Sequence, residues 1–164
     1  MATYSYDIES TYDKAEMNNV QQQVAREIES RFDFKGTPAE VEWMADKKGF
    51  KVIGSNEWQV ESIIDIIRKR LAVREISSKV LNLDEKVHEA NMQAWKEVPF
   101  KDGLKQDDAK KITKLLKEKH PKLKTQIQGD VVRCTGASKD ELQAAMQTLR
   151  AGELDFPLLF TNYR

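Results

Sequence analysis

Residues 41–56 read VEWMADKKGFKVIGSN. Two short apolar runs, Val41-Glu42-Trp43 and Phe50-Lys51-Val52-Ile53, are separated here by Lys47-Lys48-Gly49. A glycine at this place supplies the positive φ that a short hairpin loop needs, so the segment predicts a β-hairpin. Gly54-Ser55-Asn56 then ends the second strand and offers a residue that can cap a following helix.

A helix is predicted on each side of this hairpin, because apolar residues recur at spacings of three and four. The first helix runs from Asp13 to near Arg31, and the second ends near Arg74. Short strands are predicted at Tyr4–Ile8, where apolar and polar residues alternate, and at Val80–Leu83. The apolar positions that define the two helices are Met17, Val20, Val24 and Ile28, then Val60, Ile63, Ile64, Ile67 and Leu71.

The same order of elements recurs in the second half of the chain. Its predicted elements are a strand at 87–98, a helix from Asp107 to His120-Pro121, a hairpin of 123–128 with 131–135, a helix capped by Ser138, and a strand at 156–163. The two halves also resemble each other in local sequence, since Lys51-Val52-Ile53-Gly54-Ser55 matches Arg133-Cys134-Thr135-Gly136-Ala137. The chain therefore contains an internal repeat.

The fold class that follows is α+β, with two ferredoxin-like βαββαβ units. Each unit is expected to form a four-stranded antiparallel sheet with two helices on one face, because one sheet face is enough to bury both helical stripes. The domain boundary stays open. A simple tandem gives 1–86 and 87–164, whereas exchange of the first strands gives a central domain of 20–102 and a discontinuous domain of 1–19 plus 103–164.

The composition is that of a water-soluble globular protein. The 164 residues are 40% apolar and 33% charged, with no net charge at pH 7, and no apolar run approaches the ~18 residues of a membrane span. No secretory signal is readable at the N-terminus, and a single cysteine, Cys134, cannot form an internal disulfide. These features predict a cytoplasmic protein without membrane contact. The charge is uneven, with 13 Lys/Arg against 16 Asp/Glu in 1–86 and 14 against 11 in 87–164.

The sequence offers no catalytic, metal or cofactor motif. His88 and His120 are the only histidines, and no His, Cys and carboxylate cluster has the spacing of metal ligands. Phosphate-binding glycine loops and the Gly-x-Ser-x-Gly elbow are also missing from the sequence. We therefore expect a non-enzymatic protein without a cofactor. His120 is interpreted as an exposed residue near a helix C-terminus, where the helix dipole favours a cation.

The strongest positive feature is a lysine-rich region around the third helix. Nine lysines and four acidic residues lie within 101–124, and Lys110, Lys114 and Lys117 share one helix face. Such a stripe could neutralise phosphates and bind a polyanion with an affinity that falls with salt. The alternative is a solvated helix face, with acids at its N-terminus and bases toward its C-terminus as the dipole prefers.

Two further segments are candidate ligand contacts. In the second hairpin, Gln126 and Gln128 alternate with apolar residues, as Arg133 does on the next strand, so one sheet face is polar. This hairpin carries no aromatic residue, which argues against base stacking of the kind used by RRM domains. In the segment 31–37, Arg31 and Lys35 could form a phosphate clamp while Phe32 and Phe34 staple the loop. The alternative for 31–37 is a helix end closed by glycine, with both phenylalanines buried.

Four stretches together resemble the YajQ family. They are Tyr6-Asp7-Ile8, Arg31-Phe32-Asp33-Phe34-Lys35-Gly36, Gln126-Ile127-Gln128-Gly129-Asp130-Val131-Val132-Arg133, and the C-terminal Asp155-Phe156-Pro157-Leu158-Leu159-Phe160-Thr161-Asn162-Tyr163-Arg164. The likeness spans nearly the whole chain. Departures from the family pattern are Cys134 in place of an aliphatic residue, Ala137 in place of a frequent lysine and Leu159 in place of a frequent glutamine.

The resemblance implies two ferredoxin-like domains with exchanged first strands in a cytoplasmic bacterial protein that binds nucleotides or RNA. No catalytic residues come with it. It adds Asn162 and Arg164 to the candidate contacts. The full set of expected nucleotide- or phosphate-binding residues is Arg31, Phe32, Lys35, Lys110, Lys114, Lys117, Gln126, Gln128, Arg133, Asn162 and Arg164.

Three functions remain open from the sequence. The first is a nucleotide- or RNA-binding protein that holds phosphates with basic residues near a cleft between its domains. The second, implied by the resemblance, is a cyclic di-GMP receptor that regulates transcription through a protein partner. Such a receptor requires a ligand with different affinities for two conformations. The third is a protein-interaction scaffold.

Overall fold

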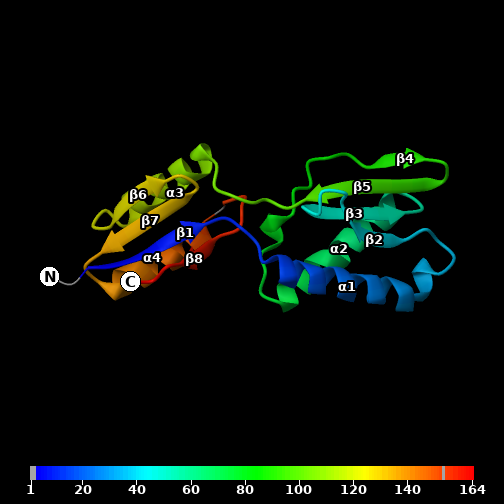
Figure 1. The fold of residues 1–164 in the computed structure, drawn as a ribbon, viewed down its shortest axis with the longest axis horizontal. Coiled ribbons are helices and arrows are strands. Elements are labelled where there is room, and N and C mark those ends of the chain that lie inside the picture. The colour runs from blue at the N-terminus through cyan, green and yellow to red at the C-terminus, as the bar shows by residue number, and fades with distance from the viewer. Residues whose placement is uncertain (1–2, 153) are drawn as a thin grey trace. The chain divides into compact units, whose positions relative to one another are not determined.

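The chain divides into two compact units in a computed structural model that describes residues 3–152 and 154–164. One unit, here the central domain, is Tyr12–Lys101, and the other, the terminal domain, combines Met1–Thr11 with Asp102–Arg164. Within the described residues, each unit contains one four-stranded antiparallel sheet and two α-helices (Figure 1). The protein is therefore α+β and consists of two ferredoxin-like units.

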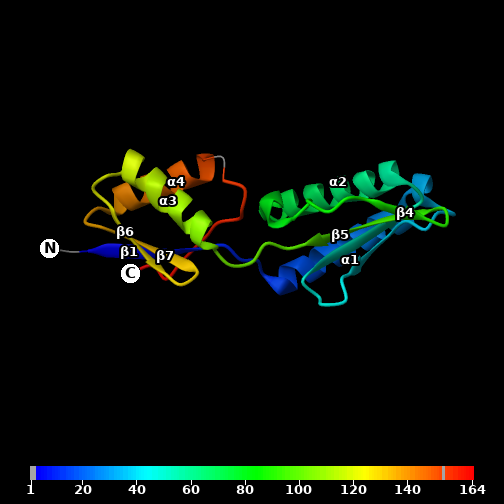
Figure 2. The same ribbon diagram turned by 90° about the horizontal axis from the view of Figure 1, so that it is seen from above.

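The terminal domain draws its sheet from both ends of the chain. Its elements are β1 (Tyr4–Glu9), α3 (Gln106–Lys119), β6 (Lys124–Gln128), β7 (Val131–Gly136), α4 (Lys139–Ala151) and β8 (Leu159–Thr161). The strand order is β6-β7-β1-β8, so β1 lies in the middle of a sheet that otherwise comes from the second half of the chain. Figure 2 shows α3 and α4 on the same side of this sheet, which leaves the other face uncovered.

The central domain repeats this arrangement. Its elements are α1 (Lys14–Ser30), β2 (Glu40–Trp43), β3 (Gly49–Gly54), α2 (Glu57–Val73), β4 (His88–Ala90) and β5 (Gln93–Pro99). The strand order is β2-β3-β5-β4, and β5 occupies the central position that β1 holds in the other sheet. Both predicted helices pack on one face of the sheet (Figure 1) and bury the predicted stripe from Met17 to Leu71.

Helix starts follow the expected capping chemistry. Asp13 accepts hydrogen bonds from the amides of Ala15 and Glu16 at the start of α1. Asn56 caps α2 by accepting from Gln59 N–H at 2.8 Å, and Ser138 caps α4 by accepting from Glu141 N–H at 3.3 Å. These caps satisfy amides that have no partner within the helix, and they confirm the predicted starts.

The β2–β3 hairpin forms as predicted, but its glycine has a different role. Lys47, with φ of 60°, supplies the left-handed residue of the turn. Gly49 is required for space instead, because a Cβ there would lie 2.4 Å from the carbonyl oxygen of Val98 and 2.6 Å from Cα of Pro99. Close approach of β3 to β5 therefore explains this glycine.

The segment between α2 and α3 differs from its prediction. Ser78–Val80 is a 3₁₀ turn, η2, and beyond it Leu81 makes only an isolated bridge to Phe100, so the strand expected at 80–83 is wrong. The segment 87–98 is two strands, because Asn91 and Met92 adopt φ of 53° and 63° and turn the chain between β4 and β5. Two consecutive left-handed residues form the turn that matches strand twist, although Asn-Met is not its usual sequence.

The last strand is shorter than predicted. The regular β8 strand is Leu159–Thr161, whereas Phe156 is buried in the core before the strand begins. Each domain has a separate apolar core, and the alternation along β1 and β7 directs Tyr6, Ile8, Val132 and Cys134 to the helices.

Within the described ranges, no helix combines the length and apolarity that crossing a bilayer requires.

Candidate functional site

A polar row crosses the uncovered face of the terminal sheet. Gln126 on β6 lies opposite Arg133 on β7, Arg133 lies opposite Asp7 on β1, and Asp7 lies opposite Thr161 on β8. Directly paired residues project to the same face, and along β1 and β7 the neighbours of the row are the buried core residues Tyr6, Ile8, Val132 and Cys134. The row therefore lies on the face that the helices leave open.

Asp7 is the centre of this row. It is only 5% exposed, and both carboxylate oxygens are used. Oδ1 accepts from Arg133 Nε at 3.0 Å, and Oδ2 accepts from Asn162 Nδ2 at 2.8 Å. The hydrogen bond from Arg133, followed by that from Asn162, holds the pKa of the Asp7 carboxyl below its usual value, despite the opposing effect of burial. Asp7 is therefore ionised near neutral pH.

A pocket lies between β1, α4 and the C-terminal tail. It has a volume of about 280 Å³. Its lining residues are Tyr4, Ser5, Tyr6, Lys139, Leu142, Gln143, Met146, Tyr163 and Arg164. Two tyrosine rings meet there, with the centroids of Tyr6 and Tyr163 6.2 Å apart. The pocket combines aromatic and apolar walls with two cations.

The polar groups of the pocket differ in the contacts that they already make within the protein. Tyr6 donates its hydroxyl hydrogen bond to the carbonyl oxygen of Leu142 at 3.3 Å, and its pKa is raised, mainly by burial, so it stays protonated. Lys139 Nζ lies 4.9 Å from the ring centroid of Tyr4, and Tyr163 is 62% exposed. A planar ring with an attached anion would find stacking surface and positive charge here.

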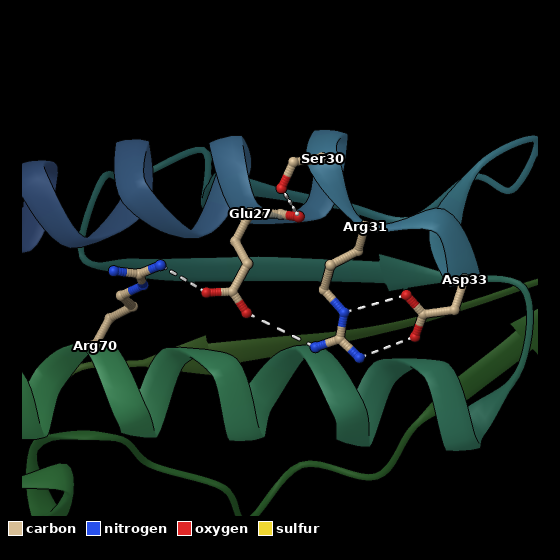
Figure 3. A network of polar contacts seen from close by, with 5 residues as sticks. All are labelled: Glu27, Ser30, Arg31, Asp33 and Arg70. Atoms are coloured by element: carbon tan, nitrogen blue, oxygen red, sulfur yellow. Dashed lines mark hydrogen bonds and ion pairs between the residues drawn. The ribbon is translucent and has the colours of Figure 1, made fainter.

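The Arg31 segment of the central domain forms an ion-pair network (Figure 3). Arg31 donates to both oxygens of Asp33, at 3.1 and 2.9 Å, and lies 3.7 Å from Glu27. Glu27 also accepts from Arg70 at 2.7 Å. The bidentate bond raises the pKa of Arg31 and lowers that of Asp33. A phosphate at this place would compete with two carboxylates for the guanidinium.

The sequence matches the family described as "Nucleotide-binding protein YajQ-like" over residues 4–164. The chain belongs to the YajQ family. Relatives named "Nucleotide-binding protein" are similar over nearly their full lengths. That of Nocardioides sp. is 38% identical over 100% of both chains, and that of Shewanella amazonensis is 40% identical over 98% of both. A relative from Mycobacterium tuberculosis, of the same name, is 39% identical over 100% of both chains.

The structure of this YajQ-family chain brings part of the expected contact set together. Gln126, Gln128 and Arg133 share the uncovered face of the terminal sheet. Asn162 joins them through Asp7. Arg164 hydrogen-bonds with the backbone of Ser5 on β1 and also lines the pocket. Five of the expected residues therefore belong to the terminal sheet or to the C-terminal tail that continues from it.

The lysine stripe of this YajQ-family chain occupies the other side of the terminal domain. Ala109, Ile112 and Leu116 are the buried face of α3. Lys110, Lys114 and Lys117 are all exposed, and at 100° per residue they lie roughly opposite that face. The stripe therefore points away from the sheet, and the polar row lies beyond the sheet on its uncovered face. These two sets do not form one surface.

The remaining expected contacts lie in the central domain. Phe34 is buried and closes the loop as expected, with the Arg31 guanidinium 4.9 Å from its ring centroid. Phe32 is 87% exposed, so the expectation that it staples the loop, or is buried there, is wrong. It lies in the 3₁₀ turn η1 (Phe32–Phe34), which directs it outward, and Lys35 is exposed directly after this turn.

Sequence reasoning missed the pocket of this YajQ-family chain. Tyr4, Lys139 and Gln143 were not among the expected contacts, although Tyr4 alternates with Tyr6 on β1 and Lys139 directly follows the cap Ser138. Strand alternation assigns Tyr4 and Tyr6 to the covered face, where packing is the usual role of aromatic residues. A cavity at the end of that face is set by how the tail runs beside β1, which periodicity does not reveal.

Two groups that could carry chemistry, His120 and Cys134, have structural roles. His120 was expected to be exposed, but its side chain is only 12% exposed and bridges Glu141, at 3.1 Å, and Thr148, at 2.7 Å. Cys134 is fully buried, and burial raises the pKa of its thiol. In the part of the chain that the structure describes, no group of three or more His, Cys, Asp and Glu could hold a metal ion.

Proposed function

We propose that the chain binds a nucleotide, without transforming it, in the pocket of the terminal domain. The observation that carries the proposal is the pocket itself, which combines the rings of Tyr4 and Tyr163 with the cations of Lys139 and Arg164. Relatives of similar length carry the name "Nucleotide-binding protein", which agrees with it.

The two kinds of lining suit the two parts of a nucleotide. A base stacked on an aromatic side chain gains about 1–3 kcal/mol, and this gain depends little on which base is bound. Tyr163, which is largely exposed, offers such a surface. Ammonium and guanidinium groups bind phosphate oxygens through charge-assisted hydrogen bonds. Lys139 and Arg164 would supply them, and the amide of Gln143 could bond a base edge.

The size of the pocket favours a mononucleotide. Its volume of about 280 Å³ lies near the lower end of the range of roughly 300–1,000 Å³ found for small-molecule sites. One base with its sugar and phosphate suits this volume better than the two bases of cyclic di-GMP. We therefore rank the cyclic di-GMP receptor function below mononucleotide binding. Titration with both kinds of ligand distinguishes the two.

Isothermal titration with GMP, AMP and cyclic di-GMP tests the proposal. Tyr163→Ala should weaken mononucleotide binding about 5- to 150-fold, the equivalent of one lost stacking contact. Lys139→Gln should weaken nucleoside monophosphate binding but not the binding of the uncharged nucleoside. Lys122→Gln, at an exposed lysine of the same domain outside the pocket, is the matched control. If neither Tyr163→Ala nor Lys139→Gln changes the affinity, the nucleotide binds outside this pocket.

RNA binding by the lysine stripe is a second candidate function. Its supporting observation is that Lys110, Lys114 and Lys117 are exposed together on one face of α3. Contacts of this kind neutralise phosphates along a backbone and need no pocket. The stripe could therefore bind RNA independently of the pocket, and the two functions separate in a variant that lacks only the stripe.

A further inference from the structure

The C-terminal tail contains one residue more than the strand beside it. Thr161 lies opposite Asp7 in the β1–β8 pairing, so regular pairing would set residue 163 opposite Ser5. Arg164 takes that position instead. Its N–H donates to Ser5 O at 2.9 Å, and Ser5 N–H donates to Arg164 O at 3.1 Å. Asn162 and Tyr163 together therefore oppose the single residue Tyr6, which defines a β-bulge.

The bulge has a left-handed residue at its first position. Asn162 adopts φ of 54°. This conformation is unfavourable for most side chains, and asparagine is among the few residues that tolerate it. The side-chain amide of Asn162 donates to Asp7 Oδ2 at 2.8 Å, so the residue that makes the bend is also tied to β1.

The extra residue decides which face Tyr163 occupies. Side chains alternate along a strand, so a regular continuation of β8 would put residue 163 on the same face as Thr161 and Asp7. With the bulge, Tyr163 lies instead against Tyr6, a residue of the covered face, and lines the pocket. Arg164, opposite Ser5, lines the pocket and also lies close enough to Asp7 to help stabilise its charge.

We propose that Asp7 and Asn162 are positioning residues that build the nucleotide pocket by holding this bulge. The identity of the ligand rests on the proposed function. The geometry of the bulge rests only on the strand register and its backbone hydrogen bonds. Neither residue lines the pocket. Asp7 acts through Asn162, and Arg133 holds the Asp7 carboxylate in place from the opposite side.

Asn162→Gly and Asn162→Val separate the backbone from the side chain. Glycine adopts positive φ freely, whereas valine is strongly disfavoured there. Asn162→Gly keeps the positive φ but loses the bond to Asp7, so the bulge should be held less firmly and nucleotide affinity should fall modestly, by about threefold. Asn162→Val should lose the bulge, and the affinity should fall at least about tenfold, as for a lost stacking ring.

A measurement without ligand distinguishes this inference from the proposed function. Nuclear Overhauser contacts between the rings of Tyr163 and Tyr6 should be strong in wild type, weakened to a similar degree in Asn162→Gly and Asp7→Asn, which both disrupt the Asp7–Asn162 bond, and absent in Asn162→Val. Glu9→Gln, at a carboxylate on the same strand and face as Asp7, should change neither the contacts nor the affinity. Ring contacts that survive in Asn162→Val would overturn the inference, whether or not a nucleotide binds. Intact contacts in wild type without nucleotide binding would overturn the proposed function alone.

Discussion

Arg133 and Asp7 lie 126 positions apart in the sequence, yet Arg133 Nε is 3.0 Å from Asp7 Oδ1. A similar placement of opposite charges recurs in the central domain, where Lys51 lies opposite Glu97 on the two middle strands. The match between the segments beginning at Lys51 and Arg133 thus extends to their cross-strand partners. A difference lies one strand further out, where Gln126 in the terminal sheet corresponds to Glu42 in the central sheet. The terminal face is therefore the less acidic of the two rows.

Asp7→Asn should destabilise the terminal domain by about 1–3 kcal/mol, because the amide can accept only one of the two bonds and leaves a charged group without its partner. Hydrogen exchange of the β1 and β7 amides measures this loss. All three tryptophans lie in the central domain, so tryptophan fluorescence should change little. Glu9→Gln is the control, and an equal loss in that variant would show that the effect is not specific to Asp7.

The contribution of Asp7 should also depend on pH. Its carboxyl pKa is lower in the folded protein than in the unfolded chain, where it is about 3.9. The stabilisation is therefore complete above about pH 4 and is lost as the pH falls through the folded-state pKa. The stability difference between wild type and Asp7→Asn should be constant from pH 7 to 5 and shrink at pH 3. A difference that grew on acidification would contradict the ionised pair.

Phe32 and Phe34 should respond very differently to truncation, although they are two residues apart. Phe34→Ala removes a buried ring and should cost about 3–5 kcal/mol. Phe32→Ala removes an exposed ring and should change stability by no more than about 0.5 kcal/mol. Urea unfolding followed by tryptophan fluorescence reports on both, since both lie in the central domain. Similar losses would mean that the loop packs differently in solution.

Met92→Gly should stabilise the central domain by about 0.5–1 kcal/mol. Met92 has φ of 63° in the two-residue turn between β4 and β5. Glycine removes the steric cost of this conformation, and this gain exceeds the additional backbone entropy that glycine loses on folding. Met92→Ala is the control, because it shortens the side chain but keeps the strained backbone. Equal midpoints of urea unfolding for the two variants would show that backbone strain is not the cause.

Replacement of Lys110, Lys114 and Lys117 by Gln should leave mononucleotide affinity unchanged, because none of the three lines the pocket. If the stripe binds single-stranded RNA, affinity for it should fall. The slope of log affinity against log salt should then decrease in magnitude by about 2, at roughly 0.7 per phosphate contact. Fluorescence anisotropy with a labelled oligonucleotide at several salt concentrations measures both quantities. An unchanged slope would mean that α3 presents only a solvated face.

Local chemistry made most of the fold predictable. The caps Asn56 and Ser138, the start of the first helix at Asp13, the buried stripes of the helices and both predicted hairpins follow from residue type and spacing. The β4–β5 turn was missed because Asn91-Met92 lacks the glycine that usually marks such a turn. Strand partners over long distances were also beyond reach. A strand with the pattern of β1 pairs equally well with any strand that completes an apolar face.

The candidate site was harder to predict because residue type alone does not tell whether a charge is already paired. Arg31 and Arg133 look alike in the sequence, and the structure pairs both with carboxylates. The charge difference between the halves of the chain also depended on where the chain was divided. By structural domain, the central part has 15 Lys/Arg and 16 Asp/Glu, and the terminal part has 12 and 11. Each domain is nearly neutral, so local arrangement matters more than total charge.

The position of β1 in the middle of the terminal sheet has a consequence for synthesis of the protein. This strand leaves the ribosome well before its partners β7 and β8, which lie more than 120 residues later in the sequence. The central domain is complete once β5 has emerged, whereas β1 waits for its partners for a further time on the order of seconds at typical translation rates. During that interval an apolar strand with two unpaired edges is exposed to other nascent chains. We therefore expect slower translation between α3 and β8 to lower the fraction of protein that reaches the native state.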